Sequence, residues 1–280
     1  MKKNQFVASL ALCAIVSAAP AFSAALVTSG AGSDAAAITA ARDSFRLGIG
    51  GGTVTSGAGL FGGIRREINW DAVPDKFSAP NNLPANFFNV NSPRGVVFGT
   101  PGSGFQVSAN APTPPPDPPG PLVRFGNIDA SYPGEFQFFS PQKLFTAIGS
   151  NVTDVNFFVA GTSIPGFTSA FGSVFTDVDL PNSTTLEFFT GASSLGTFGV
   201  PNFTTDHSQS FLGVRFDAGE RITRVRITSG NAALGAPESG NDLVVMDDFL
   251  FAEPRAVPEP STMVLLAAGL LAVAAVRRRG

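Results

Sequence analysis

Carboxylates are the side chains of this sequence with the greatest potential for chemistry, and two pairs of them stand out by position. Asp177 and Asp179 are two residues apart in a strand-favouring run, so both side chains would lie on the same face of a strand. Asp247 and Asp248 are adjacent in another such run. Because Ca²⁺ takes about six to eight oxygen ligands, clustering of two such groups would make a site. The sequence therefore predicts a structural Ca²⁺ site with Asp177, Asp179 and one or both of Asp247 and Asp248.

Asn69 and Asp71 form a third group of oxygen-bearing side chains in a further candidate strand. All three groups also have a simpler interpretation as solvated strand ends and turn caps, where Asp and Asn are common. The Asp-x-Asp-x-Asp-Gly loop of an EF-hand does not occur in the sequence. A metal site would therefore depend on the fold bringing separate strands together.

Catalytic residues are not indicated by any pattern in the chain. His207 is the only histidine, and its neighbours Asp206 and Ser208 would point away from it on a strand. No Gly-x-Ser-x-Gly turn is present, and no spacing marks the pair of carboxylates that glycoside hydrolysis needs. We expect a non-enzymatic protein, with a hydrolase acting on polysaccharide as the alternative.

Two other residue types limit the possible sites. Cys13 is the only cysteine and lies in an apolar N-terminal run, so the rest of the chain has no disulfide and no thiolate ligand for zinc. Trp70 is the only tryptophan. On a strand it would ordinarily pack in the core, and exposed it would offer a platform for stacking sugars.

The N-terminus has the features of a secretory signal peptide. Lys2 and Lys3 precede an apolar stretch over residues 6–19, and small residues follow as far as residue 25. A charged start, a short apolar core and a small-residue exit predict export and removal of residues 1–25. An uncleaved membrane anchor is the alternative for so short a run.

The C-terminus carries a second targeting pattern. Val257, Pro258, Glu259 and Pro260 precede an apolar run over residues 263–276, which a basic cluster of Arg277, Arg278 and Arg279 closes. As a helix this run would cover about 21 Å, less than the ~30 Å hydrocarbon core of a bilayer. The arginines would remain in the cytoplasm and leave the body outside. An ordinary C-terminal membrane helix is the alternative.

The order of these three parts resembles the PEP-CTERM sorting signal of Gram-negative bacteria, over residues 257–280. That resemblance implies transient anchoring in the inner membrane, recognition by an exosortase, and transfer of the body to the cell surface or extracellular matrix. It also implies a link with exopolysaccharide and biofilm.

The region between the two signals predicts a β-sandwich. It contains most of the 27 phenylalanines, and thirteen short strand-favouring runs recur about every ten residues over residues 67–251 with Gly and Pro between them, among them runs at residues 122–128, 135–139 and 172–179. Residues 26–63 are rich in Ala, Gly and Ser and contain one short predicted helix, capped by Ser33, with Ile38, Ala41 and Phe45 on one face. We expect an all-β fold: a single antiparallel sandwich over residues 64–255.

The pattern of short strands resembles a jelly roll of the lectin kind. The phrases at residues 66–71 and 213–221 are also similar to those of a group of uncharacterised PEP-CTERM proteins, which implies no activity. Removal of five basic and one acidic residue with the two signals, from totals of 18 and 21, leaves a net charge of −7. An acidic body argues against nucleic acid and is compatible with Ca²⁺ or neutral glycans.

Overall fold

The computed structural model describes residues 25–52, 54, 57–59, 65–109, 123–237, 239–258, 269 and 277. The predicted signal peptide (1–25), the proline-rich run at residues 112–121 and the apolar run at 263–276 lie almost entirely outside these residues. Within them, no helix is both long enough and apolar enough to cross a membrane.

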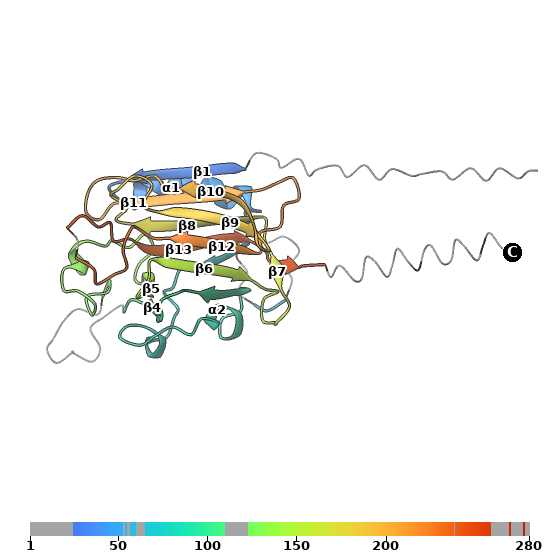
Figure 1. Cartoon of the computed structure of the whole chain (residues 1–280), viewed down its shortest axis with the longest axis horizontal. Coiled ribbons are helices and arrows are strands. Elements are labelled where there is room, and N and C mark those ends of the chain that lie inside the picture. Colours follow the sequence, from blue (N-terminus) through green and yellow to red (C-terminus); the bar gives the residue numbers. More distant parts are fainter. Residues whose placement is uncertain are drawn as a thin grey trace, which may run out of the picture.

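Two antiparallel sheets form the body, as the spacing of the strands predicts (Figure 1). The first sheet has the order β1 (Leu26–Gly32), β11 (Gln209–Arg215), β8 (Ala170–Thr176), β13 (Val245–Ala252), β5 (Phe145–Ile148) and β4 (Gly104–Val107), with β2 (Arg65–Ile68) also paired to β13. The second has the order β10 (Ser193–Gly199), β9 (Thr185–Thr190), β12 (Arg224–Thr228), β6 (Val152–Phe157) and β3 (Val96–Gly99). A separate ribbon pairs β7 (Gly166–Phe167) with β14 (Arg255–Ala256).

Phenylalanine fills the space between the sheets. Phe157 of the second sheet meets Phe171 and Phe251 of the first, with ring centroids 6.3 and 5.6 Å apart. Trp70 is 1% exposed and stacks on Phe145 at 4.1 Å, so it packs in the core and offers no platform to a sugar. Its indole N–H donates to the backbone oxygen of Asp247 at 2.7 Å, which satisfies the one polar group of this ring.

One long helix, α1 (Ala35–Gly48), covers the outer face of the first sheet near β1 and β11. Its N-cap is Asp34 rather than the predicted Ser33, because the Asp34 carboxylate accepts the Ala37 N–H at 3.1 Å. Ile38 and Phe45 are buried as predicted, and Phe45 lies where a side chain on Gly213 would stand, 2.5 Å from a Cβ placed there. Within residues 25–258 as described, the other helical segments are short: η1 (Asp75–Phe77), α2 (Phe87–Val90) and η2 (Tyr132–Gly134).

Several element predictions are wrong in ways that matter for the site. The strands predicted at residues 122–128 and 135–139 are turns and irregular chain within the part that is described, although Phe125 and Phe136 are buried. The strand predicted at residues 172–179 ends at Thr176, so Asp177 and Asp179 follow a strand rather than lie within it. β1 was not predicted, because its sequence of small residues has no apolar alternation.

Candidate functional site

Asp247 and Asp248 lie at an irregularity of β13. The pairing of β13 with β8 shifts in register between Met246 and Phe249, which places these two aspartates in the bulge. The backbone N–H of Phe139 donates to Asp247 Oδ2 at 2.7 Å, and the N–H of Ser140 to the same oxygen at 3.2 Å. The Ser140 hydroxyl lies 3.1 Å from Asp247 Oδ1 and 2.7 Å from Asp248 Oδ1.

Burial raises the pKa of both aspartates in this bulge, and the charge of Asp248 raises the pKa of Asp247 further. The donors from Phe139 and Ser140 oppose the rise at Asp247. At Asp248, Ser140 and the charge of Arg42, whose Nη1 is 3.7 Å from Oδ2, do the same. These contacts hold the chain at residues 139–140 against the first sheet, which is a structural task.

Asp177, Asp179 and Asp206 form a second acidic group, here called the aspartate cluster. One carboxylate oxygen from each lies within 4.8 Å of the other two. Asp177 and Asp179 follow the end of β8, and Asp206 belongs to the turn that precedes β11. Asp177 has a left-handed backbone with φ of 71°, a conformation that Asp and Asn adopt more readily than most residues.

Burial and mutual repulsion raise the pKa values of two carboxyl groups in the aspartate cluster. Burial raises the pKa of Asp177 to about 8, with further contributions from the charges of Asp179, Asp206, Asp242 and Glu135. The pKa of Asp179 is raised for the same reasons, burial first. Asp177 is 9% exposed, whereas Asp206 is exposed to solvent.

The structure thus brings together two of the four aspartates named from the sequence. Asp247 and Asp248 are not members of the aspartate cluster. Asp206 was missed as a ligand candidate, since only the pairing of β8 with β11 carries it to this place. Asn69 and Asp71 form a separate contact at 3.0 Å, and Asp71 also accepts the N–H of Gln142 at 2.6 Å.

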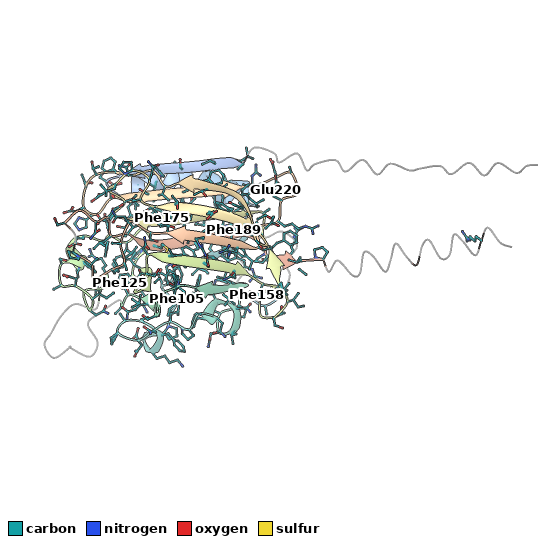
Figure 2. All side chains as sticks on the ribbon, viewed as in Figure 1. Phe105, Phe125, Phe158, Phe175, Phe189 and Glu220 are labelled. Atoms are coloured by element: carbon teal, nitrogen blue, oxygen red, sulfur yellow. The ribbon has the colours of Figure 1, made fainter. Side chains whose placement is uncertain are left out.

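Among the hollows on the described surface, two bear on the site. One of about 610 Å³ borders the aspartate cluster and is lined by Ser33, Arg124, Gln137, Phe138, Phe139, Pro141, Asp206 and His207. The other, of about 570 Å³, lies near β14, and its lining includes Phe167, Arg215, Asp217, Glu220, Arg221 and Arg255. Figure 2 labels Glu220 of the second hollow and Phe125, next to Arg124 of the first, towards opposite ends of the sandwich.

The two hollows share one construction. In the first, the guanidinium of Arg124 lies 5.2 Å from the ring centroid of Phe138. In the second, the guanidinium of Arg221 lies 5.2 Å from the ring centroid of Phe167. Both rings are half-buried, so each hollow combines an aromatic surface with a guanidinium group; Nη1 of Arg124 already donates to the Pro133 and Phe136 carbonyls at 2.7 and 2.8 Å.

The last described strand leads directly into the predicted sorting signal. Arg255 and Ala256 of β14 pair with β7, and the Val257 N–H donates to the Pro165 carbonyl at 3.0 Å. Pro258 is the last residue described before the gap, so Glu259 and Pro260 are outside the description. The folded body therefore extends to the first residue of the signal.

Comparison with known families matches residues 256–279 to the PEP-CTERM protein-sorting motif. No curated protein and no solved structure matches the chain. The match covers the predicted order of Pro-Glu-Pro, apolar run and arginines. The chain therefore carries a PEP-CTERM sorting motif, which supports export and sorting by an exosortase.

Proposed function

We propose that the sorted β-sandwich is a non-enzymatic component of the cell surface or extracellular matrix that binds exopolysaccharide. The sorting motif supports this location, since it implies export and sorting at the membrane. The single observation that carries a binding role is the 610 Å³ hollow, which joins a half-buried ring, Phe138, to the polar groups of Gln137 and Asp206. Sugars are recognised by such combinations of an aromatic face and a few placed polar groups.

The charge of the body favours some polysaccharides over others. With a net charge of −7 once both signals are removed from the totals of 18 basic and 21 acidic residues, the domain would repel a strongly anionic polymer in the absence of a cation. Neutral polysaccharides, or acidic ones bridged by a divalent cation, are the classes expected to bind.

A hydrolase is the second candidate, because the aspartate cluster has one feature of an acid–base pair. Its oxygens lie within 4.8 Å of one another, and the pKa of Asp177 is raised to about 8, so one carboxyl group would hold a proton at neutral pH. Asp177 is only 9% exposed, however, and a glycosidic oxygen in the hollow would meet the exposed Asp206 instead. This burial favours the binding role.

The binding role is tested with a matched pair of variants. Phe138→Ala removes the ring from the first hollow, and Phe167→Ala removes the equivalent ring, also beneath an arginine, from the second. Stacking on an aromatic ring typically contributes about 1 kcal/mol, so Phe138→Ala should weaken polysaccharide binding by about fivefold while Phe167→Ala leaves it unchanged. If the two variants weakened polysaccharide binding equally, the first hollow would not be the specific site. If the parent chain bound none of the polysaccharides tested, the binding role would be rejected.

The same samples distinguish binding from hydrolysis. Release of reducing ends from polysaccharide should be absent for the parent chain and for Asp177→Asn alike. Release that is lost in Asp177→Asn would establish the hydrolase in place of the binding protein.

Processing of the tail is tested separately by mass spectrometry of the protein extracted from the cell surface. Its C-terminus should lie near Pro258, Glu259 and Pro260. A surface-exposed product that still ends in Arg279 and Gly280 would show that the tail is a lasting anchor.

A further inference from the structure

Two chain segments meet at the aspartate cluster and are fixed there by their backbones. The last residue of β8 is paired with the first residue of β11. Beyond that pair, the Asp177 N–H donates to the Ser208 carbonyl at 3.0 Å, and the Phe203 N–H donates to the Val178 carbonyl at 2.9 Å. The three carboxylates are therefore held close by main-chain hydrogen bonds and not by any attraction between themselves.

Buried oxygen atoms without a donor gather at this junction. Asp177 Oδ1 and Asp179 Oδ1 are buried and have no hydrogen-bond partner, and the whole of Asp177 is 9% exposed. Ser208 Oγ and Gln209 Oε1, at the start of β11, are in the same state. These atoms make up four of the six buried side-chain oxygens without a partner in the part of the chain that is described. An unpaired buried carboxylate oxygen is costly, so the two from Asp177 and Asp179 favour a bound cation at this junction.

No basic side chain of the described residues pairs with these carboxylates. Among the described residues, none of the three carboxylates forms an ion pair with Lys, Arg or His. Asp242 stands behind them, 2% exposed, and adds a further negative charge. Its oxygens accept the N–H groups of Asp179 at 3.0 Å and Leu180 at 3.4 Å, so Asp242 is satisfied where the aspartate cluster is not.

The geometry points to a Ca²⁺ site in which carboxylate oxygens of Asp177, Asp179 and Asp206 bind one ion, with water completing its shell. Oxygen donors without nitrogen or sulfur select hard cations. Ca²⁺ accepts flexible coordination, whereas Mg²⁺ demands near-octahedral geometry and gives up its water reluctantly. One carboxylate oxygen from each residue lies within 4.8 Å of the other two, close enough for all three to approach a single ion.

Such an ion would join the end of β8 to the turn before β11. That turn carries Asp206 and His207, which line the 610 Å³ hollow, so the ion would also fix one wall of it. Extracellular Ca²⁺ sites commonly bind in the range of about 0.1 to 1 mM, which suits a domain exported from the cytoplasm. The site is independent of the proposed polysaccharide binding and would exist without it.

The site is tested by the melting temperature of the full-length chain in detergent, stripped with EDTA and then titrated with CaCl₂. Binding to the folded state alone at 100 times the Kd should raise the melting temperature by about 5 °C or more. Asp206→Asn should abolish the rise, and because Asp206 is exposed this variant will fold. Asp75→Asn, which changes an aspartate whose side chain is 75% exposed on η1, is the control and should keep the rise.

A second variant protects the test against a general effect on stability. Asp177→Asn keeps a residue that tolerates the left-handed backbone and replaces the carboxyl group with a neutral amide. In EDTA it should melt no lower than the parent, and CaCl₂ should leave its melting temperature unchanged. The assignment is overturned by an absent Ca²⁺ response in the parent, by a full response in both variants, or by an equal response to MgCl₂ at the same concentrations.

Discussion

The Asp247–Asp248 pair and the aspartate cluster look similar in sequence, but the structure gives hydrogen-bond donors to the first and not to the second. Asp247 is 0% exposed and accepts the main-chain N–H groups of Phe139 and Ser140, and the Ser140 hydroxyl lies 3.1 Å from its Oδ1. Asp177 is 9% exposed, and its Oδ1 accepts none. A buried carboxylate with donors fixes a loop to a sheet, whereas one without donors requires an ion or a proton. The donors around an acidic residue therefore indicate its role better than its burial does.

The largest expected loss of stability comes from removing Asp247 of the Asp247–Asp248 pair, here called the donor-rich group. Asp247→Ala leaves the N–H groups of Phe139 and Ser140 without this acceptor, while the Ser140 hydroxyl keeps Asp248. We expect the free energy of unfolding to fall by about 3 kcal/mol or more. Urea denaturation measures it, with Asp177→Asn in EDTA as the contrast, expected within about 1 kcal/mol of the parent. Equal losses in the two variants would remove the distinction between the groups.

The pH dependence of stability gives the next effect. Burial first, then repulsion by Asp248, raises the pKa of Asp247 above 3.8, and the neighbouring charges of Arg42 and Glu67 act on Asp248. Between pH 3.8 and the raised pKa the folded chain binds more protons than the unfolded chain, so the free energy of unfolding decreases as pH rises. An Asn amide at position 247 imitates the protonated carboxyl and cannot ionise.

Asp247→Asn should therefore make this decrease smaller. The free energy of unfolding of the variant, relative to that of the parent, should be highest at high pH. Urea denaturation from pH 5 to pH 8 in millimolar CaCl₂ checks it, since Ca²⁺ holds the other acidic group in one state. A slope as steep in the variant as in the parent would assign the pH dependence to other residues.

Removing the positive charge of Arg42, which lies near Asp248, should have a smaller effect on the free energy of unfolding. Arg42 lies 3.7 Å from Asp248 and 4.6 Å from the centre of the Phe139 ring. Arg42→Met keeps much of the packing and removes the charge, which should lower the free energy of unfolding by about 1 kcal/mol. Thermal unfolding with and without CaCl₂ should show an unchanged Ca²⁺ response, and a lost response would connect the two acidic groups.

The smallest expected effect is that of Asp206→Asn in the absence of Ca²⁺. Asp206 is exposed, so the change in the free energy of unfolding should stay below about 0.5 kcal/mol. Chemical denaturation in EDTA measures it. A large loss would mean that Asp206 stabilises the turn by itself rather than through an ion.

The sandwich could be predicted because the alternation that indicates each strand lies within a short stretch of sequence. Alternation of Val225 and Ile227 with Arg224 and Arg226 places the first pair in the core and the second on the face where both arginines meet Asp154. The sorting motif is equally local, as a contiguous pattern over residues 256–279.

The aspartate cluster could be predicted only in part, because it depends on contacts distant in the chain. Asp177 and Asp179 were identified from their spacing, but the strand was expected to continue through them, and β8 instead ends at Thr176. The position of Asp206 follows from the pairing of β8 with β11, about thirty residues apart, which no local pattern specifies. The donors that distinguish Asp247 come from residues 139–140, more than a hundred positions away.

The most direct test of this account is calorimetric titration of Ca²⁺ into the stripped full-length parent, Asp177→Asn and Asp247→Asn. The parent and Asp247→Asn should each bind one ion per chain, and Asp177→Asn should bind none. Binding that survives in Asp177→Asn but disappears in Asp247→Asn, or no binding to the parent up to several millimolar, would contradict the claim that the group without donors is the metal site.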